Sequence, residues 1–475
     1  MNTTWCVENL RNCQAWNDSG LPITTTSNEA AQLYDALLRQ LVCWSDCHEL
    51  GGLMATAEKL IAADPESIIG RCLVLSLDCL GVTKSVIYTR VHQMIVVLKA
   101  HNDPIFAADL NRLVKDAQKS GNNREKLHCQ AIQHFAFGRL SQASKCWEEI
   151  LAEHPTDLMA VKFAHDSYFF SWRFGRKFAY DGERYSFVHG MHAFALEENE
   201  KYKTAEIEAR YALELNPFDP WATHAIAHCY EMTGQFKLGI EFMESTRSYW
   251  EPAWLLACHN HWHTALFHLE HADYEKVLDI YDTEIVERSK SKTMLDVVDA
   301  ASLLQRLEIE KVDVGRERWK ALVPLIEEQL DNHVLAFNDV HCAMILANID
   351  DFELEQSHAR SLQSYVSTTA VENENRNITE KLGIPICESI ADFRRGEFAD
   401  CFDRLYAARN SIREIGGSNA QRDVFTQLAL SAGFQSEASG HKDMAMELLA
   451  ERQRFKHGSL VGSRILQMHE TGNKL

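Results

Sequence analysis

A recurring pattern of small and large residues constrains the fold of this chain more than any other feature. The clearest copies run over residues 185–290, where Tyr202, Ala205, Ala212 and Pro217 have the spacing expected of the second helix of a paired-helix repeat. Small residues let two antiparallel helices approach closely, and large residues fill the holes beside them. Pro217 ends the helix, because its ring cannot continue the hydrogen-bond ladder.

The next unit along the chain carries the same pattern. Ala227, Tyr230, Gly234, Phe236 and Gly239 fall at the matching positions of this unit. Glycine adopts positive φ without steric cost, so Gly234 permits the tight turn between the two helices. A period of about 34 residues is that of the tetratricopeptide repeat. We therefore predict an all-α protein, a tetratricopeptide-like α-solenoid in which antiparallel helix pairs form a right-handed superhelix.

Weaker copies of the pattern flank this centre, and no low-complexity segment separates them. They lie near residues 53–65, 138–155 and 396–408. We expect residues 27–475 to form a single solenoid, preceded by a helix-poor arm over residues 1–26. Residues 172–183 break the helical rhythm, and we expect a loop there that packs on the solenoid.

The composition indicates which partners and compartments to expect. The net charge is −20, and such an acidic chain repels phosphate backbones and anionic membranes, so we expect no nucleic-acid partner and no membrane partner. The 13 cysteines lie mostly in apolar helical stretches, as reduced and buried thiols do. The amino-terminal residues lack a signal-peptide pattern, and no apolar run is long enough to cross a bilayer. We expect a cytoplasmic protein.

Two pairs of histidines fall at corresponding places in consecutive repeats. His224 and His228 lie four residues apart in the first helix of one repeat, and His259 and His263 do so in the next. The pairs are separated by 259 − 224 = 35 residues, close to one repeat length. Residues four apart share a helix face, and first helices line the concave side of such a solenoid. The two repeat registers differ by three positions, so the pairs need not lie level. Glu231 lies on a similar face.

Four imidazoles that converge on one cleft are suited to bind a divalent metal, or to supply a general base. A structural role is the simpler interpretation, because a chain with 22 histidines contains pairs four apart by chance. We treat His224, His228, His259 and His263, together with Glu231, as candidate contacts of a polar ligand, and the four histidines also as a candidate site for a divalent metal. We assign no other cofactor.

Polar residues recur where the other first helices are expected to run. Each cluster mixes polar and apolar side chains within one helix, as a groove-lining helix does. The ligand-binding candidates from these clusters are His165, Asp166, Asp296, Asp299, Asn338, Asp339, His341, Asn419, Arg422 and Asp423. Arg422 is the best anion contact, because a guanidinium can hold a carboxylate with two hydrogen bonds. Its simpler interpretation is a salt bridge to Asp423 or another acid, and Asn419 is interpreted first as part of the Ser418 helix cap.

Several stretches resemble the tetratricopeptide repeat protein 38 family over nearly the full length of the chain. They are NCQAWNDSGLPITTTSNEA, HPTDLMAVKFAHDSYFF, HAIAHCYEM, ACHNHWH, MLDVVDA, FNDVH and GGSNAQRDVF. The resemblance implies a soluble helical-repeat protein and carries no reaction, cofactor or partner with it. This family usually has a tyrosine at the position of His261, which makes His261 a poor candidate for an essential role. Residues 172–183 also differ from the family pattern.

The sequence is consistent with two functions. The first is a binding module whose concave groove holds a peptide, a protein or a polar small molecule. The alternative is a hydrolase-like or metal-dependent enzyme with a His/Asp/Arg active site in that groove. The general base is then His228 or His263, the orienting acid is Asp339 or Asp423, and Arg422 binds an anion. Motifs of common nucleotide-binding proteins, serine hydrolases and zinc peptidases are absent, so the sequence leaves open whether the chain is an enzyme.

Overall fold

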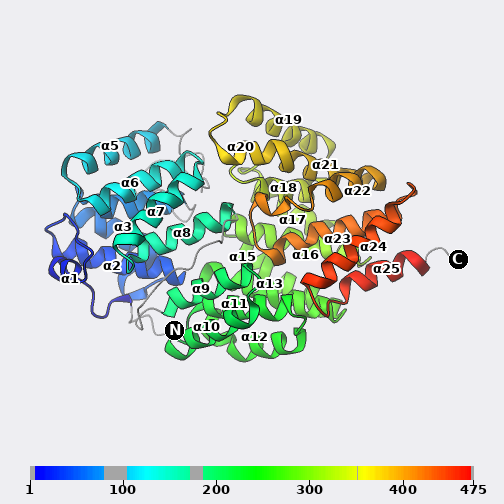
Figure 1. The fold of residues 1–475 in the computed structure, drawn as a ribbon, viewed down its shortest axis with the longest axis horizontal. Helices are drawn as coiled ribbons and strands as arrows, with labels where there is room; N and C mark the ends of the chain where they lie inside the picture. Colours follow the sequence, from blue (N-terminus) through cyan, green and yellow to red (C-terminus); the bar gives the residue numbers. More distant parts are fainter. Residues whose placement is uncertain (1–5, 80–103, 172–185, 350, 472–475) are drawn as a thin grey trace.

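The computed structural model of this protein describes residues 6–79, 104–171, 186–349 and 351–471. Every regular element among these residues is helical, and successive helices pack side by side into a curved solenoid (Figure 1). The predicted all-α, tetratricopeptide-like class is thereby confirmed. The loop expected over residues 172–183 lies outside the described residues. None of the described helices is long and apolar enough to cross a membrane.

The amino-terminal part of the chain holds a short helix followed by helix pairs. Within the arm, where few helices were expected, α1 (Cys13–Asp18) begins after Asn12, whose side chain accepts a hydrogen bond from the amide of Ala15. The elements that follow are α2 (Asn28–Cys43), the 3-10 turn η2 (His48–Leu50), α3 (Gly52–Ala63), α4 (Ile68–Cys79), α5 (Pro104–Ser120), α6 (Asn123–Ala136), α7 (Leu140–Glu153) and α8 (Leu158–Ser171).

The central part contains the repeats that the sequence shows most clearly. Its elements are α9 (Ser186–Glu198), α10 (Tyr202–Leu215), α11 (Pro220–Met232), α12 (Phe236–Trp250), α13 (Trp254–Glu270), α14 (Tyr274–Ile280), the π-helical η4 (Tyr281–Ile285), α15 (Val286–Ser289), α16 (Met294–Ile309) and α17 (Arg316–Ile326). Gly234 makes the predicted turn between α11 and α12 with φ at +71°. A Cβ atom at Gly239 would lie 2.6 Å from the ring of Phe267, so only glycine allows this approach of α12 to α13.

The carboxyl-terminal part continues the pairs. Its elements are α18 (Ala336–Ala347), α19 (Phe352–Thr368), α20 (Glu374–Ile378), the π-helical η5 (Thr379–Gly383), α21 (Ile384–Arg395), α22 (Phe398–Ala408), the 3-10 turn η6 (Ile412–Ile415), α23 (Asn419–Gln435), α24 (His441–Phe455) and α25 (Val461–Thr471). A capping box starts α23: Ser418 accepts from the amide of Gln421, and the Gln421 side chain accepts from the amide of Ser418. The predicted cap at Ser418 is therefore present.

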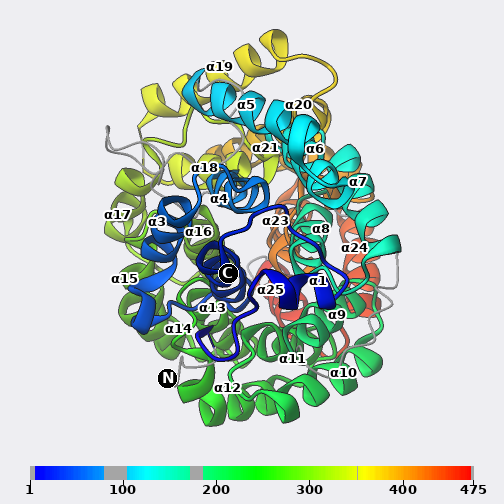
Figure 2. The ribbon, with the colours of Figure 1, turned by 90° about the vertical axis from the view of Figure 1, so that its left-hand side faces the viewer.

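The solenoid closes on itself. The turn between α6 and α7 contacts α20, where the amide of Glu374 donates to the carbonyl of Gly138 at 3.1 Å. The Glu374 carboxylate also accepts from the amide and hydroxyl of Ser141, at 2.9 and 2.7 Å. Figure 2 shows the resulting ring-like arrangement of helices. On its inner side α23 packs against both α11 and α16, so the concave side is filled there instead of forming the open groove that the sequence suggested.

The first helices of the pairs are consequently buried on nearly all sides. Every residue of α11 is buried, polar ones included. Nearly every residue of α16 is buried as well. A buried polar group is costly unless it has a partner, so the polar residues on these helices need partners inside the protein.

One such partnership joins α6 to the start of α8. The carboxylate of Asp157 accepts from Arg124 at 2.7 Å, lies 2.9 Å from Nε2 of His128, and caps α8 through the amide of Ala160. All three polar side chains are at most 2% exposed. Burial alone raises the pKa of Asp157, but the charges of His128 and Arg124 outweigh this effect and hold the pKa well below its ordinary value.

We predict that Asp157→Ala lowers the free energy of unfolding by about 3–5 kcal/mol, because it leaves a buried guanidinium without its partner. The loss is measured by urea denaturation at pH 7. Since the pKa of Asp157 is lowered by folding, its stabilising effect is present above the ordinary pKa and shrinks as the pH falls below about 4. Glu287→Ala is the control: it removes only an exposed ion pair with Lys290, which contributes less than about 1 kcal/mol. Equal losses in the two variants would contradict the prediction.

Candidate metal centre

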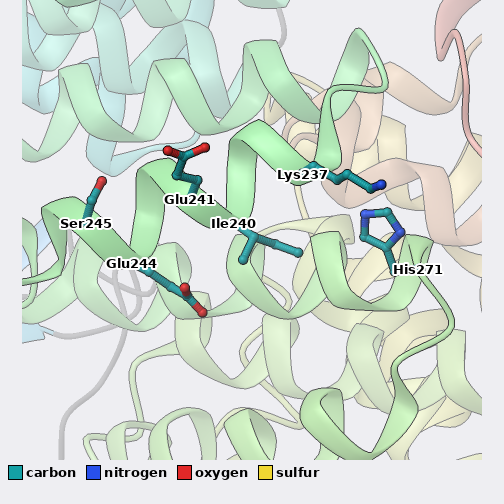
Figure 3. Close-up of a pocket in the computed structure, with 6 residues that line it drawn as sticks. All are labelled: Lys237, Ile240, Glu241, Glu244, Ser245 and His271. Carbon is teal, nitrogen blue, oxygen red and sulfur yellow. The ribbon is translucent and has the colours of Figure 1, made fainter.

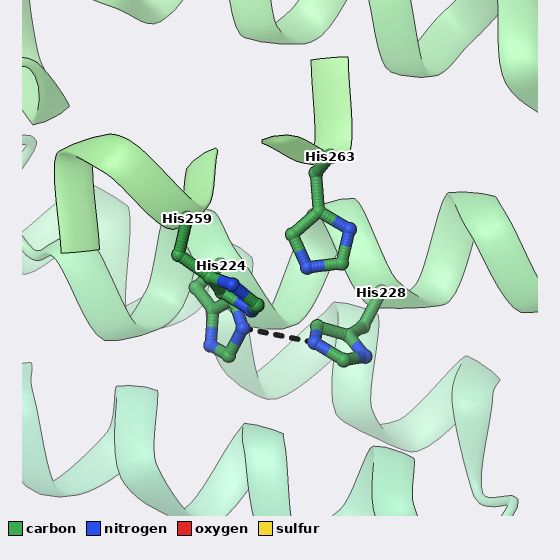
Figure 4. A group of neighbouring side chains, drawn as sticks. All are labelled: His224, His228, His259 and His263. Carbon is green, nitrogen blue, oxygen red and sulfur yellow. Dashed lines mark hydrogen bonds between the residues drawn. The ribbon is translucent and has the colours of Figure 1, made fainter. Parts of the chain in front are cut away.

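Four histidines from two neighbouring inner helices meet inside the solenoid. His224 and His228 extend from α11, and His259 and His263 extend from α13 (Figure 4). One ring nitrogen of each histidine lies within 4.8 Å of the corresponding nitrogens of the other three. The structure therefore brings together both pairs that the sequence singled out, and we call this group the histidine tetrad.

The two pairs lie level with each other. The ring centroids of His224 and His259 are 4.8 Å apart, and those of His228 and His263 are 4.4 Å apart. The difference of three positions between the repeat registers therefore does not separate the pairs along the helix axes. Side-by-side packing of α11 and α13, with one polar stripe on each facing the other, is what assembles the tetrad.

The tetrad is buried. His228 and His263 are fully buried, and His224 and His259 are each 3% exposed. Burial, followed by the charges of the neighbouring rings, lowers the pKa of His224 and His263 well below the ordinary value. Burial also lowers the pKa of His228 to about 4. These three imidazoles are therefore neutral at pH 7, the form in which a ring nitrogen has a lone pair for a metal ion.

A carboxylate from another helix lies behind each of the two rings that α13 contributes to the tetrad. Nδ1 of His259 lies 2.5 Å from Oδ2 of Asp299, and Nδ1 of His263 lies 2.9 Å from Oε2 of Glu231. A carboxylate only accepts, so it fixes the proton on Nδ1 and leaves the lone pair on Nε2. Nε2 of His263 has no hydrogen-bond partner in the described part of the chain. Histidines that ligate metals are commonly held in this way.

The two rings that α11 contributes differ from each other in what lies beside Nδ1. Nδ1 of His228 lies 3.3 Å from Oε2 of Glu197, although the two atoms are not aligned as a hydrogen bond. Nδ1 of His224 has no hydrogen-bond partner among the residues described, and its ring packs on that of Phe194, with centroids 4.8 Å apart. The Nε2 atoms of His224 and His228 are 2.8 Å apart and share one hydrogen bond (Figure 4).

The carboxylates behind the α13 rings are themselves anchored by the carboxyl-terminal helices. Asp299 accepts from Nε2 of Gln421 at 2.9 Å. Glu231 accepts from Nζ of Lys456 at 2.8 Å. Both donors come from segments more than 100 residues away in the sequence, so the orientation of the rings depends on how the solenoid closes.

Arg422 and Asp423, which the sequence offered as an anion clamp and an orienting acid, have structural partners. Nη2 of Arg422 lies 3.5 Å from Oε2 of Glu198, so its acid partner is Glu198 and not Asp423. The amide of Asn419 also donates to Glu198, at 3.0 Å. Asp423 accepts two hydrogen bonds from Arg452, both at 2.7 Å. Asp423 therefore forms an ion pair with α24 and does not orient a histidine of the tetrad.

Two further candidate groups make their own local hydrogen bonds. His165 on α8 packs edge-on against Trp221, with ring centroids 4.8 Å apart, and the neighbouring Asp166 pairs with Lys162. Asp339 on α18 lies 3.0 Å from Nδ1 of His333. Asp339, a candidate orienting acid, therefore belongs to a network on α18, and His165 contributes to the aromatic surroundings of the tetrad.

The remaining candidates also bond locally. Nδ1 of His341 lies 2.7 Å from the carbonyl of Phe337 in the preceding turn of α18. Asn338 lies at the start of the same helix and is only partly buried. Asp296 is buried on α16, where Oδ2 accepts from the hydroxyl of Ser291 at 3.0 Å.

Sequence reasoning missed two acidic residues at the end of α9. Glu197 and Glu198 are 0% and 3% exposed, and burial raises the pKa of Glu197 to about 8 and that of Glu198 to about 7. Adjacent acids near a helix end resemble a solvated terminus in sequence. Only the packing of α9 against α11 shows that they face His228.

A second group of potential ligands lies near the surface, between α12, α13 and η4. His261 is 3.6 Å from Glu251 and 3.4 Å from Glu284. Arg247 pairs with both acids at 2.6 Å, and Arg288 lies 3.4 Å from each. Because arginines already balance the two carboxylates, this group is an ion-pair network and not a candidate for a cation.

The outer face of α12 has a shallow hollow, shown in Figure 3. Its lining residues are Lys237, Ile240, Glu241, Glu244, Ser245 and His271. The side chains spread along the helix and do not point to a common centre (Figure 3). This surface offers no arrangement comparable to the tetrad.

Comparison with known proteins adds a loose structural likeness. No protein-family model matches the chain. A human IFIT1 dimer with PPP-AAAA aligns over 100% of both chains with 13% identity and a TM-score of 0.37. Cut9, from the crystal structure of the APC/C hetero-tetramer Cut9–Hcn1, aligns over 98% of this chain and 76% of its own, with 13% identity and a TM-score of 0.40. A human IFIT1 dimer with m7Gppp-AAAA aligns over 95% of this chain and 99% of its own, with 14% identity and a TM-score of 0.37. Likeness at this level assigns no function.

These comparisons do correct one expectation. The sequence analysis excluded a nucleic-acid partner because the chain is acidic, but the similar IFIT1 chains are described with capped or triphosphate oligonucleotides. The exclusion is therefore wrong. Its physical weakness is that net charge is a sum over the whole surface, whereas binding depends on how charge is distributed locally.

Asp296 provides a test of the burial of the inner helices. Burial raises the pKa of Asp296 to about 8, so the carboxyl is protonated in the native state at pH values where it is ionised in the unfolded chain. The raised pKa of Asp296 therefore lowers the free energy of unfolding progressively as the pH rises from about 4 to about 8. Asp296→Asn removes this effect and can still accept from Ser291. We predict that the variant gains stability relative to the wild type between pH 5 and pH 8, measured by urea denaturation at both values. A difference that stays constant with pH would contradict this.

Proposed function

We propose that this chain is a metalloprotein that holds one divalent transition-metal ion of the zinc class in the histidine tetrad. The observation that carries this proposal is the convergence of four buried imidazoles, three of them with a carboxylate beside Nδ1. Imidazole nitrogen is a preferred ligand of zinc, copper, nickel and iron, and a carboxylate behind it fixes the ring.

An unsatisfied ring nitrogen favours a bound ion over a purely structural cluster. Nε2 of His263, on the opposite side of the ring from Glu231, has no hydrogen-bond partner within the described ranges. A buried polar atom without a partner costs about 1–3 kcal/mol, and native interiors contain few of them. A metal ion in the tetrad would satisfy this nitrogen, whereas the side-chain packing leaves it without a partner.

The surrounding acids also favour a cation. Glu231 and Asp299 contact the tetrad directly, and Glu197 lies 3.3 Å from His228. Both carboxylate oxygens of Glu197 lack a hydrogen-bond partner in the described residues. A dication among these groups would reduce the cost of burying the charges of Glu231 and Asp299 and would favour the ionised form of Glu197, which burial disfavours.

Of the two functions that the sequence suggested, the metal-dependent enzyme gains the most support. The residues expected to line an open groove are buried, so a peptide would not reach them, whereas ring nitrogens within 4.8 Å of one another can hold a single ion. A zinc-class ion polarises carbonyl groups and lowers the pKa of bound water. Binding of a protein or peptide elsewhere on the helical repeats remains a proposal to which this structure assigns no residues.

We predict about one equivalent of zinc-class metal per wild-type chain after loading with Zn²⁺ and removal of excess ion, as expected for a single site of four imidazoles. His259→Ala and His263→Ala lose most of it, because each removes a ligand. The measurement is inductively coupled plasma mass spectrometry on the full-length protein. His341→Gln is the matched control, since it changes another buried histidine that bonds only a backbone carbonyl. Equal metal content in control and tetrad variants, or none in the wild type, would refute the metal centre.

The carboxylates behind the rings provide a second measurement on the same site. Asp299→Asn and Glu231→Gln keep the size of the side chain but weaken its hold on the Nδ1 proton. Changes of this kind reduce metal affinity by about 10–100-fold. We expect a loss of that size in competition titrations with a zinc chelator. Affinities equal to that of the wild type would show that these carboxylates do not support a bound ion.

A further inference from the structure

The four histidines of the tetrad are not equivalent. We propose that His228, His259 and His263 are the permanent ligands of the ion, and that His224 is an exchangeable fourth ligand whose place is taken by water or a small monodentate anion. This inference rests on the metal centre proposed above. It adds which coordination position opens and what class of ligand enters there.

The three permanent ligands are those with a carboxylate beside Nδ1. Asp299 lies 2.5 Å from Nδ1 of His259, and Glu231 lies 2.9 Å from Nδ1 of His263. A carboxylate at this position keeps the proton on Nδ1, so the Nε2 lone pair is directed into the tetrad before any ion arrives. No proton has to move for these two rings to bind a metal.

His228 has an acid at the same place, although the two groups are not aligned as a hydrogen bond. Glu197 lies 3.3 Å from its Nδ1 and has no hydrogen-bond partner in the part of the chain that the structure describes. The tautomer of His228 that presents the Nε2 lone pair to an ion carries its proton on Nδ1, beside Glu197, and the atom 2.8 Å from Nε2 is Nε2 of His224. With His228 in this tautomer, His224 is the donor of the hydrogen bond between them, and the proton of His224 lies on Nε2.

His224 thus has its proton on the atom that would have to bind the ion. To become a ligand through Nε2, it must move that proton to Nδ1. Nδ1 of His224 has no acceptor among the described residues, and the ring packs against Phe194, with Trp221 at a centroid distance of 6.3 Å. The tautomer that binds metal consequently leaves a buried N–H without a partner. This cost is specific to His224 and makes it the weakest of the four ligands.

A labile position is the feature that separates catalytic zinc sites from structural ones, which are closed by four protein ligands. The entering ligand must be small, because the tetrad is at most 3% exposed and aromatic rings lie beside His224. It must also donate a lone pair to the ion. Water, hydroxide and small monodentate anions meet both conditions.

The test uses full-length protein freed of metal and loaded with Co²⁺, whose visible spectrum reports coordination number. We expect His224→Ala to retain about one Co²⁺ per chain, whereas His259→Ala retains less than about a tenth under the same conditions. Azide serves as the probe anion. It should change the visible spectrum of the wild type and act at lower concentration on His224→Ala, where no imidazole competes.

His224→Gln is a second variant that keeps more of the side-chain volume, and circular dichroism confirms that each variant is folded. Co²⁺ loss from both folded His224 variants as complete as that from His259→Ala would overturn the inference. So would azide leaving the spectra of the wild type and His224→Ala unchanged. A wild-type protein that takes up neither Zn²⁺ nor Co²⁺ would instead refute the metal centre itself, so the two failures are distinct.

Discussion

The packing of α11 against α13 is the interaction on which the centre of this molecule depends. The two helices are first members of consecutive repeats, and each directs a stripe of polar residues at the other. Because α11 is buried over its whole length, these polar groups cannot rely on water. Each must be satisfied by a neighbouring helix or by a bound species. The partners observed around the tetrad follow from this requirement.

The closure of the solenoid supplies many of those partners. Lys456 reaches Glu231 across 225 positions of sequence, and Asn419 reaches Glu198 across 221. A solenoid of this class is often described through contacts between adjacent repeats alone. Here the carboxyl-terminal helices fill the concave side and orient the acids behind the histidines, so the centre would be incomplete in a shortened array.

Local sequence patterns predicted the helices and the faces of their residues, but not the long-range contacts. The helical period placed His224 and His228 on one face, and the repeat length suggested that the α13 pair faces the same cleft, while the two registers left open whether the pairs lie level. Nothing in the local pattern shows that α23 lies against α11, so Arg422 seemed available for an anion although it contacts Glu198. Glu197 was missed for the same reason, since only tertiary packing buries it. The prediction that excluded a nucleic-acid partner was wrong for a different reason: the net charge is one number for the whole chain and does not describe a local surface.

The energetic cost of the tetrad argues that it is more than a packing solution. Apolar side chains of similar size would fill the space between α11 and α13 without needing carboxylates, and replacing buried ionic groups with apolar ones is often neutral or stabilising. Sequences that break such a local rule usually do so at functional sites. An ion that binds only the native state would offset this cost, by about 2.7 kcal/mol when its free concentration is 100 times its dissociation constant. A site that is unfavourable when empty and favourable when filled couples the stability of the inner helices to the presence of its ligand.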